Sequence, residues 1–396
     1  MDNIPKKGAR LNSKNDIRSA IKNFFKVAVE KEQFNLVLMP MRVPSQDSYA
    51  WMMIKDIELL EDANPIAPIM PVNAANAIKK YTRKGNGRYK IAVVVRPCEI
   101  RAIIELVKLN QIKLEDITLF SYDCVGALPM QDYISDPEKG EKDFDKLVED
   151  RTYDSKIIKD TCELCDKCSI PAATDLHFAI NKDGIILIPN SEKGEKVVET
   201  LDIETQGITS LLAEWSKDMD SIISKRAIAR KTEFESVAKM AVGLDNLKET
   251  FANCIGCHNC NSVCPICYCR QCYFDSVANK PNSDFIKIRA DKKGALGYPQ
   301  DKIMFHVGRM AHMSLSCINC GLCSDACPVD IPVAKIFSYT GAQTQEAFDY
   351  IAGNSVGDAL PMRDYKLEEL GELKDLVKSV EVEAEAKVEA KGGGHE

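Results

Sequence analysis

Cysteines in two identically spaced runs are the residues of this 396-residue chain most able to do chemistry. Each run reads Cys-x2-Cys-x2-Cys-x3-Cys-Pro, and the runs begin at Cys254 and Cys317. This spacing is typical of ferredoxins with two [4Fe-4S] clusters, in which the first three cysteines of a run bind one cluster and the fourth binds the other. The sequence therefore predicts two ligand sets: Cys254, Cys257, Cys260 and Cys327 for one cluster, and Cys317, Cys320, Cys323 and Cys264 for its partner.

The spacing has a physical reason. A [4Fe-4S] cluster takes four soft thiolates at tetrahedrally arranged corners. A tight loop can cover three corners, and a fourth ligand on the same loop would strain it. Gly256 and Gly321 each lie beside a ligand, where a loop can need a positive φ or a close backbone approach. Cys-x2-Cys pairs also form zinc sites, so a structural zinc protein is the alternative, but two full runs closed by Cys-Pro favour iron and sulfur.

Composition limits the classes of protein that the chain can represent. Its N-terminus is polar and lacks the apolar core of a signal peptide, and no apolar run reaches the ~20 residues that span a membrane. We therefore expect a cytoplasmic protein without a membrane span, in which 16 cysteines are metal ligands and not disulfides. The formal net charge of −7 argues against a nucleic-acid partner.

A βαβ unit is the clearest fold signal. Residues 90–95 are a continuous apolar, β-branched run, residues 99–109 have helical spacing, and residues 117–121 form a second strand. Strands joined in this way run parallel, so their carboxyl ends meet at one edge of the sheet. Cys98 and Cys124 each follow a strand, and we expect their sulfurs to lie close together at this edge, where open α/β sheets bind ligands. The alternative is one buried and one incidental thiol.

The remaining pattern predicts an α/β N-terminal domain with a mostly parallel sheet, followed by a helix-rich ferredoxin domain, α+β overall. We expect these domains at 1–235 and 236–345, with a C-terminal extension at 346–396 whose tail, 378–396, is disordered. Residues 129–160 are charged and predicted to be loop. Further elements are predicted from apolar spacing and turn residues: a strand at 35–40, a β-hairpin at 177–188, and helices at 17–30, 72–81, 209–224, 226–242 and 302–313.

Eight cysteines lie outside the two runs. Cys162, Cys165 and Cys168 cannot complete a cluster alone, and Cys98 and Cys124 could supply what is missing for a third cluster. The alternative is an independent zinc knuckle with an outside ligand. The last three cysteines are either buried packing residues or ligands of a fourth cluster: Cys267, Cys269 and Cys272.

Several segments in this order resemble the coenzyme F-420 hydrogenase/dehydrogenase beta subunit family, and within it the beta subunits of formate dehydrogenases. The matching segments are Arg96-Pro97-Cys98-Glu99, CDKCSIP from Cys165, and residues 254–272 and 314–337. The resemblance implies a subunit that passes electrons between a catalytic partner and a two-electron carrier. It also implies an FAD that exchanges hydride with coenzyme F-420, and a cluster near it on Cys98, Cys124, Cys165 and Cys168.

The family's glycine-rich flavin segment has no match in residues 1–60, and the stretch after Cys168 keeps Asp175 but not the glycines that usually lie nearby. We therefore expect an iron–sulfur electron-transfer subunit of a multi-subunit oxidoreductase, without catalytic residues of its own. Its partners would be a catalytic formate dehydrogenase or hydrogenase subunit and another redox complex, such as one of heterodisulfide-reductase type. The alternative is an FAD-containing subunit that itself oxidises or reduces coenzyme F-420.

Overall fold

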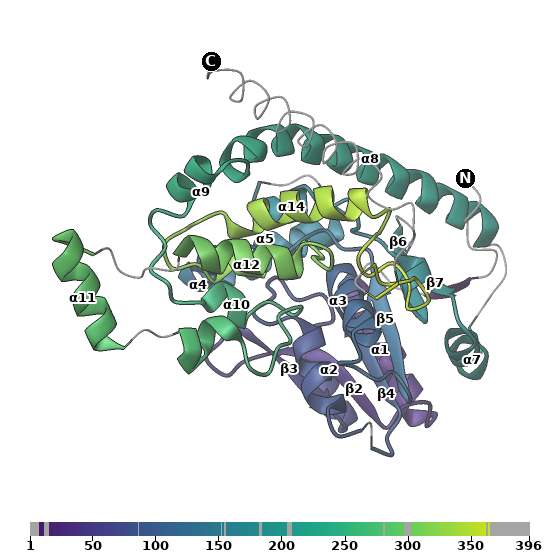
Figure 1. Ribbon diagram of the computed structural model, residues 1–396. Helices are drawn as coiled ribbons and strands as arrows, with labels where there is room; N and C mark the ends of the chain where they lie inside the picture. The colour runs from purple at the N-terminus through teal and green to yellow at the C-terminus, as the bar shows by residue number, and fades with distance from the viewer. Residues whose placement is uncertain are drawn as a thin grey trace.

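The chain folds around one mixed β-sheet (Figure 1). The computed structural model describes residues 8–11, 16–85, 87–151, 153, 156–181, 184–203, 208–279, 282–296, 302–361 and 363–364. Within these ranges the sheet has seven strands in the order β1-β7-β6-β5-β4-β2-β3. Their bounds are β1 (Ala9–Leu11), β2 (Leu36–Arg42), β3 (Tyr49–Ile54), β4 (Ile91–Val95), β5 (Ile117–Tyr122), β6 (Leu176–Asn181) and β7 (Gly184–Pro189).

The predicted βαβ unit is confirmed at the centre of this sheet. Strands β4 and β5 are parallel, with Ile91 opposite Ile117, and α3 (Pro97–Lys108) connects them. Pro97 starts the helix with its φ already set, and the Glu99 carboxylate accepts the backbone N–H of Arg96 at 3.0 Å. Strands β2 and β6 extend the parallel centre, while β3, β7 and β1 add antiparallel pairs outside it. The α/β domain is thus confirmed, with a mixed sheet.

Aromatic side chains fill one face of the sheet. Phe24 and Phe25 lie on α1 (Ile17–Glu30), a helix whose predicted bounds are confirmed. Their rings meet Phe120 and Phe178 edge to face, at centroid distances of 4.9 to 6.0 Å. Such contacts add to the hydrophobic stabilisation that burial of each ring already provides. This packing fixes the position of β5, the strand that leads to Cys124.

Charged residues between β5 and β6 form helices where the sequence predicted loop. The helices are α4 (Met130–Ser135) and α5 (Pro137–Glu149). The Asp136 side chain accepts the backbone N–H of Lys139 at 3.1 Å, and Pro137 follows at the first helical position. The loop prediction was wrong because it weighed the charge of this segment and missed its cap. The predicted helix at 72–81 and hairpin at 177–188 are present as α2 (Ala74–Thr82) and β6–β7.

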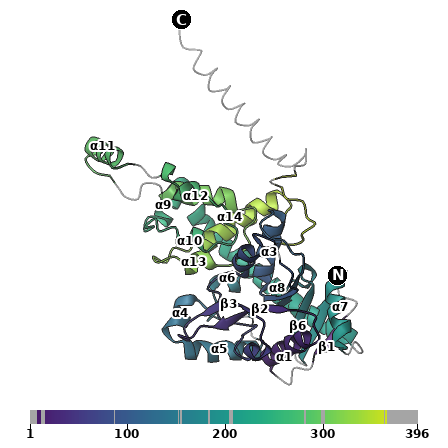
Figure 2. The same ribbon diagram turned by 90° about the horizontal axis from the view of Figure 1, so that it is seen from below.

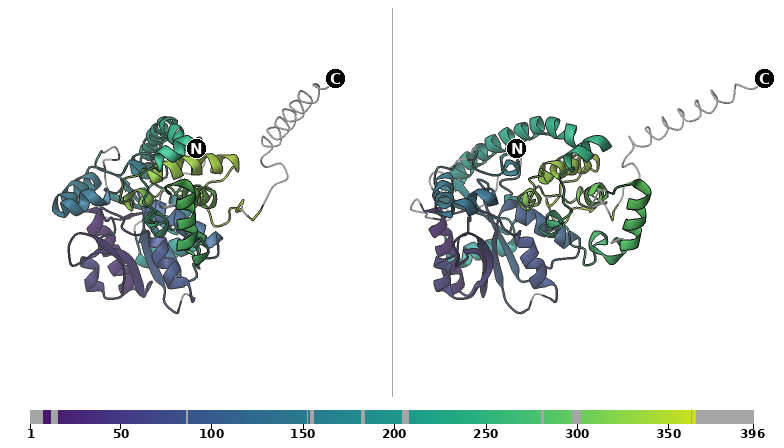
Figure 3. Two further views of the ribbon diagram at one scale, coloured as in Figure 1. Left: turned by 60° about the vertical axis from the view of Figure 1, so that its left-hand side comes forward. Right: turned by 90° about the vertical axis from the view of Figure 1, so that its left-hand side faces the viewer.

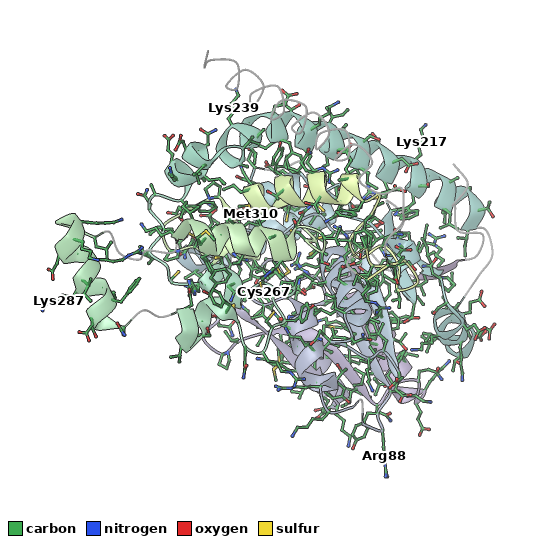
Figure 4. All side chains as sticks on the ribbon, viewed as in Figure 1. Arg88, Lys217, Lys239, Cys267, Lys287 and Met310 are labelled. Carbon is green, nitrogen blue, oxygen red and sulfur yellow. The ribbon has the colours of Figure 1, made fainter. Side chains whose placement is uncertain are left out.

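A single long helix, α8 (Ile208–Ala241), replaces the two helices predicted at 209–224 and 226–242. It arches over the sheet and over α14 (Val333–Ala347), as Figure 3 shows. Phe234 meets Tyr339 of α14 edge to face at 5.6 Å. Figure 4 shows Lys217 and Lys239 pointing outward from α8. The helix continues through residues 224–226 because no proline or glycine interrupts it there, and the Arg226 side chain is buried beneath it.

The cysteine runs lie in a helical part beside the sheet, with the predicted helix at 302–313 present as α12 (Lys302–Met313). The other helices here are α9 (Leu244–Thr250), α10 (Asn259–Ser262) and α13 (Leu322–Asp325). Between the runs, α11 (Ser283–Lys293) projects from the body (Figure 2). Within the described part of the chain, no helix has both the length and the apolar composition needed to cross a membrane. The predicted disordered tail, 378–396, lies outside the described residues.

The aromatic packing around β5 gives a stability prediction. Phe120→Ala removes a fully buried ring and should lower the free energy of unfolding by about 3–5 kcal/mol. Phe285→Ala is the matched control, because Phe285 is 46% exposed on α11 and should change stability by less than about 0.5 kcal/mol. Chemical denaturation followed by circular dichroism measures both, and equal losses would contradict this assignment of the core.

Candidate metal centres

The two cysteine runs have the same backbone conformation. In the first run Gly256 and His258 have φ of 66° and 58°, and at the matching positions of the second run Asn319 and Gly321 have φ of 58° and 81°. Left-handed residues before and after the second cysteine turn the chain so that successive cysteines face one centre. The predicted need for positive φ at both glycines is thus confirmed. His258 and Asn319 adopt it as well, and they were not expected from the sequence.

The first predicted ligand set comes together across the two runs. Burial raises the pKa of the Cys260 thiol to about 11, and nearby Cys254, Cys257 and Cys327 add to this rise against the opposing charge of Arg309. Cys327 belongs to the second run, so the structure brings it to the first three cysteines of the first run. Cys257 is exposed, which places this set near the surface.

The second set shows the reciprocal arrangement. Burial raises the pKa of Cys317 to about 11, and the neighbouring Cys264 contributes to the rise. Burial and the charge of Cys264 likewise raise the pKa of Cys320, and Cys323 feels both Cys320 and Cys264. Cys264 is therefore the residue of the first run that lies among the cysteines of the second.

A third group of thiols lies at the carboxyl edge of the sheet. Cys124 follows β5, and its backbone N–H donates to the carbonyl of Cys168 at 2.9 Å. Burial raises the pKa of Cys168, with contributions from Cys165 and Cys124. Burial also raises the pKa of Cys162 to about 11, where Lys159 opposes the rise and Cys124 and Cys165 add to it. The structure thus brings together the segments that the sequence linked.

Cys98 lies between the third group and the second set. It is in the first turn of α3, and burial raises the pKa of its thiol, with contributions from Glu99, Cys124 and Cys320. The expected proximity of Cys98 and Cys124 at the ends of β4 and β5 is therefore present. Cys320 is a residue of the second run, so the edge of the sheet and the ferredoxin-like part meet at Cys98.

The three cysteines after the first run differ in burial and in their contacts. Cys267 lies beside Cys264, since a hydrogen bond from the Cys267 thiol lowers the pKa of Cys264 to about 6 against the effect of burial. The Cys267 sulfur is also 3.4 Å from the sulfur of Met313 on α12, which suits a packing residue. Cys269 is exposed and Cys272 half-buried.

Buried arginines accompany the thiols and were not predicted. Arg309 on α12 donates from Nη1 to the sulfur of Cys260 at 3.0 Å. The Arg226 guanidinium on α8 donates to the carbonyl of Tyr153 at 2.6 Å, and its charge faces Cys168, Cys165 and Cys124. Neither arginine has a carboxylate partner among the described residues, and the Nε of each is buried without a hydrogen-bond partner there. Only the contacts reveal these residues, because an arginine on a helix usually faces solvent.

These features fit [4Fe-4S] clusters. A buried guanidinium is costly unless an anion compensates it, and an oxidised cluster with four thiolates carries about −2. Burial disfavours the thiolate form of free cysteines, and bound iron would reverse that preference. Among the described residues, which include every cysteine, no group of three Cys, His, Asp or Glu side chains lies close enough to hold one metal ion. Such a group would bind a single ion, whereas each thiolate of a [4Fe-4S] cluster binds a different iron.

The two parts of the chain meet tightly around these thiols. Lys159 forms a buried ion pair with Asp325 of α13, and a Cβ at Gly321 would lie 2.3 Å from the Thr161 hydroxyl. Beside this junction is a cavity of about 350 Å³. Its charged lining residues are Asp132, Lys159, Asp160, Asp325, Asp330 and Lys335.

The fold and the thiol sets define an iron–sulfur protein in which an α/β domain adjoins a ferredoxin-like part. Residues 250–331 match the 4Fe-4S dicluster domain family. The chain is 29% identical over 376 residues to the F420-dependent formate dehydrogenase subunit beta of Methanocaldococcus jannaschii, covering 86% of this chain and 93% of that protein. It is 29% identical over 397 residues to the F420-dependent formate dehydrogenase 1 subunit beta of Methanococcus maripaludis, covering 88% and 93%.

These similarities confirm the resemblance to the coenzyme F-420 hydrogenase/dehydrogenase beta subunits that the sequence motifs indicated. A chain of the F420-reducing [NiFe] hydrogenase complex from Methanosarcina barkeri also matches, with a TM-score of 0.42 and 13% identity over 62% of this chain and 96% of that chain.

The crossed ligand sets can be tested by counting iron in double variants. Replacing Cys257 and Cys327 by serine removes two ligands of one cluster and should cost about four irons per chain. Replacing Cys257 and Cys264, two residues of the same run, should cost about eight, because each belongs to a different cluster. Iron analysis of anaerobically purified variants gives both values, and the reverse order would show that each run holds its own cluster.

Proposed function

We propose that this chain is the iron–sulfur electron-transfer subunit of a multi-subunit oxidoreductase of formate dehydrogenase or hydrogenase type. The observation that carries the proposal is the series of thiol groups. The third group adjoins the second set where Cys98 lies near Cys320. The second set adjoins the first because each set takes its fourth cysteine from the other run. The series begins at the edge of the sheet and ends near the surface at Cys257. When bound, [4Fe-4S] clusters accept and release single electrons, so such a series suits transfer across the chain.

The two relatives support the choice of partner, because each is named as a subunit of an F420-dependent formate dehydrogenase. One end of the series would then face a catalytic formate dehydrogenase or hydrogenase subunit. The other end would face a second redox complex, such as one of heterodisulfide-reductase type. The cysteines are all free, which suits a reducing compartment, and we place the protein in the cytoplasm.

A second candidate is the FAD-containing subunit that reacts with coenzyme F-420. The cavity at the junction does not fit the diphosphate of FAD. Four aspartates and two lysines line it, a difference of −2, and both lysines are already paired: Lys159 with Asp325, and Lys335 with Asp160 and Glu233. A dianionic group would be repelled there. This charge balance argues against this cavity as a flavin site.

Five thiols compete for the third cluster, which takes four. We propose Cys98, Cys124, Cys165 and Cys168 as its ligands. Cys98 lies at the N-terminus of the 12-residue helix α3, where the helix dipole favours a thiolate. Cys162 is the fifth thiol, and the nearby charge of Lys159 favours its thiolate form, which is the form that binds iron. Its exclusion from the cluster therefore has to be tested directly. Cys267, Cys269 and Cys272 are proposed as thiols outside the clusters, and the alternative is a fourth cluster that includes them.

Composition of the anaerobically purified protein tests the function. We expect about 12 irons and an equal amount of acid-labile sulfide per chain, no stoichiometric FAD and no turnover of coenzyme F-420. Cys98→Ser should cost about four irons, and Cys162→Ser, the matched control, should keep the full content. About 16 irons would indicate the fourth cluster. FAD released on denaturation together with F-420 turnover would establish the flavin-bearing alternative, and zinc without sulfide would establish a structural zinc protein.

A further inference from the structure

Arg309 lies in the protein interior between the two ligand sets of the cysteine runs. It is 3% exposed, and the rings of Phe305 and Phe337 lie 5.6 and 4.6 Å from its guanidinium carbon. Besides the 3.0 Å contact of Nη1 with the Cys260 sulfur, Nη2 donates to the Cys260 carbonyl at 3.0 Å. These two bonds and two rings hold the guanidinium in one orientation beside the first set.

The same charge reaches the second set. Arg309 lines one small cavity together with thiols of that set: Cys264, Cys317, Cys320 and Cys323. The positive charge of Arg309 therefore lies beside thiols of both ligand sets.

Among the described residues, no carboxylate lies within ion-pair distance of Arg309. Its Nε is also buried without a hydrogen-bond partner in the described part of the chain. Removing one charge of a buried pair typically destabilises a protein, so an uncompensated guanidinium at this depth is unfavourable. The negative charge available to it is that of the thiolates and the clusters they would hold.

We propose that Arg309 is a shared counter-charge that raises the midpoint potentials of both clusters of the cysteine runs. This inference rests on the proposed ligation. Reduction adds one electron to a cluster, and a fixed cation in a medium of low dielectric constant stabilises the added charge. The cluster on Cys254, Cys257, Cys260 and Cys327 also receives the hydrogen bond to sulfur, and such bonds raise the potential further. Arg309 thus keeps both clusters reducible.

Lys79 of α2 offers an internal comparison. It is half-buried, and its interactions with thiols involve Cys264 and Cys267. Its charge therefore reaches Cys264, a proposed ligand of the second set. Removing Lys79 should change one potential, whereas removing Arg309 should change two.

The test is a potentiometric titration of the holoprotein followed by electron paramagnetic resonance, with iron content measured in each variant. Arg309→Gln should lower both midpoint potentials, with the larger shift at the cluster whose signal is lost in Cys257→Ser. Arg309→Lys keeps the charge and alters the hydrogen bond, so only that cluster should shift. Lys79→Gln should lower the other potential alone. Arg289→Gln, an exposed arginine on α11, should leave both unchanged.

Two outcomes separate the failure of this inference from that of the proposed function. Full iron content with wild-type potentials in Arg309→Gln overturns the role of Arg309 and leaves the proposed function intact. Absence of iron from the wild-type protein overturns the proposed function itself. If Arg309→Gln does not retain its iron, Arg309→Met, an uncharged side chain that fits an apolar interior, decides: a lowered potential at both clusters supports the inference, and unchanged potentials contradict it.

Discussion

Negative charge held inside the protein is the constraint on which this structure depends. Thiolates need a cation when they are buried, because the interior screens charge far less than water does. Iron would supply most of that compensation, and Arg226 and Arg309 supply a fixed remainder. Both arginines are buried because α8 and α12 pack against segments that are distant in the sequence. The helices that cover the thiols therefore also set the electrostatic environment of whatever the thiols hold.

The junction between the sheet and the ferredoxin-like part follows from the same requirement. Arg101 of α3 donates to the carbonyl of Ala352 at 2.9 Å and to that of Ile318 at 3.2 Å. The Tyr350 hydroxyl donates to Glu105 of the same helix at 2.5 Å. These buried bonds tie the segment after α14 and the second cysteine run to α3. As a result, Cys98 at the start of α3 faces Cys320, and the third thiol group continues the series.

The sequence predicted those features that depend on local spacing. The two cysteine runs and the βαβ unit could be predicted because each is a short sequence pattern that few residue types can form. Arg309 and Arg226 were not readable, since their burial comes from neighbours far along the chain. The helices α4 and α5 were missed because a single cap, Asp136 with Pro137, decides them in a charged segment. The break predicted within α8 was wrong, because residues 224–226 contain no proline or glycine that would end a helix.

An iron-edge anomalous difference map from crystals grown without oxygen tests the central claim most directly, because it locates the metal. The account predicts one iron density among Cys254, Cys257, Cys260 and Cys327, a second among Cys317, Cys320, Cys323 and Cys264, and a third among Cys98, Cys124, Cys165 and Cys168. Density confined within each run, or single-atom peaks at the zinc edge in place of iron, would contradict it.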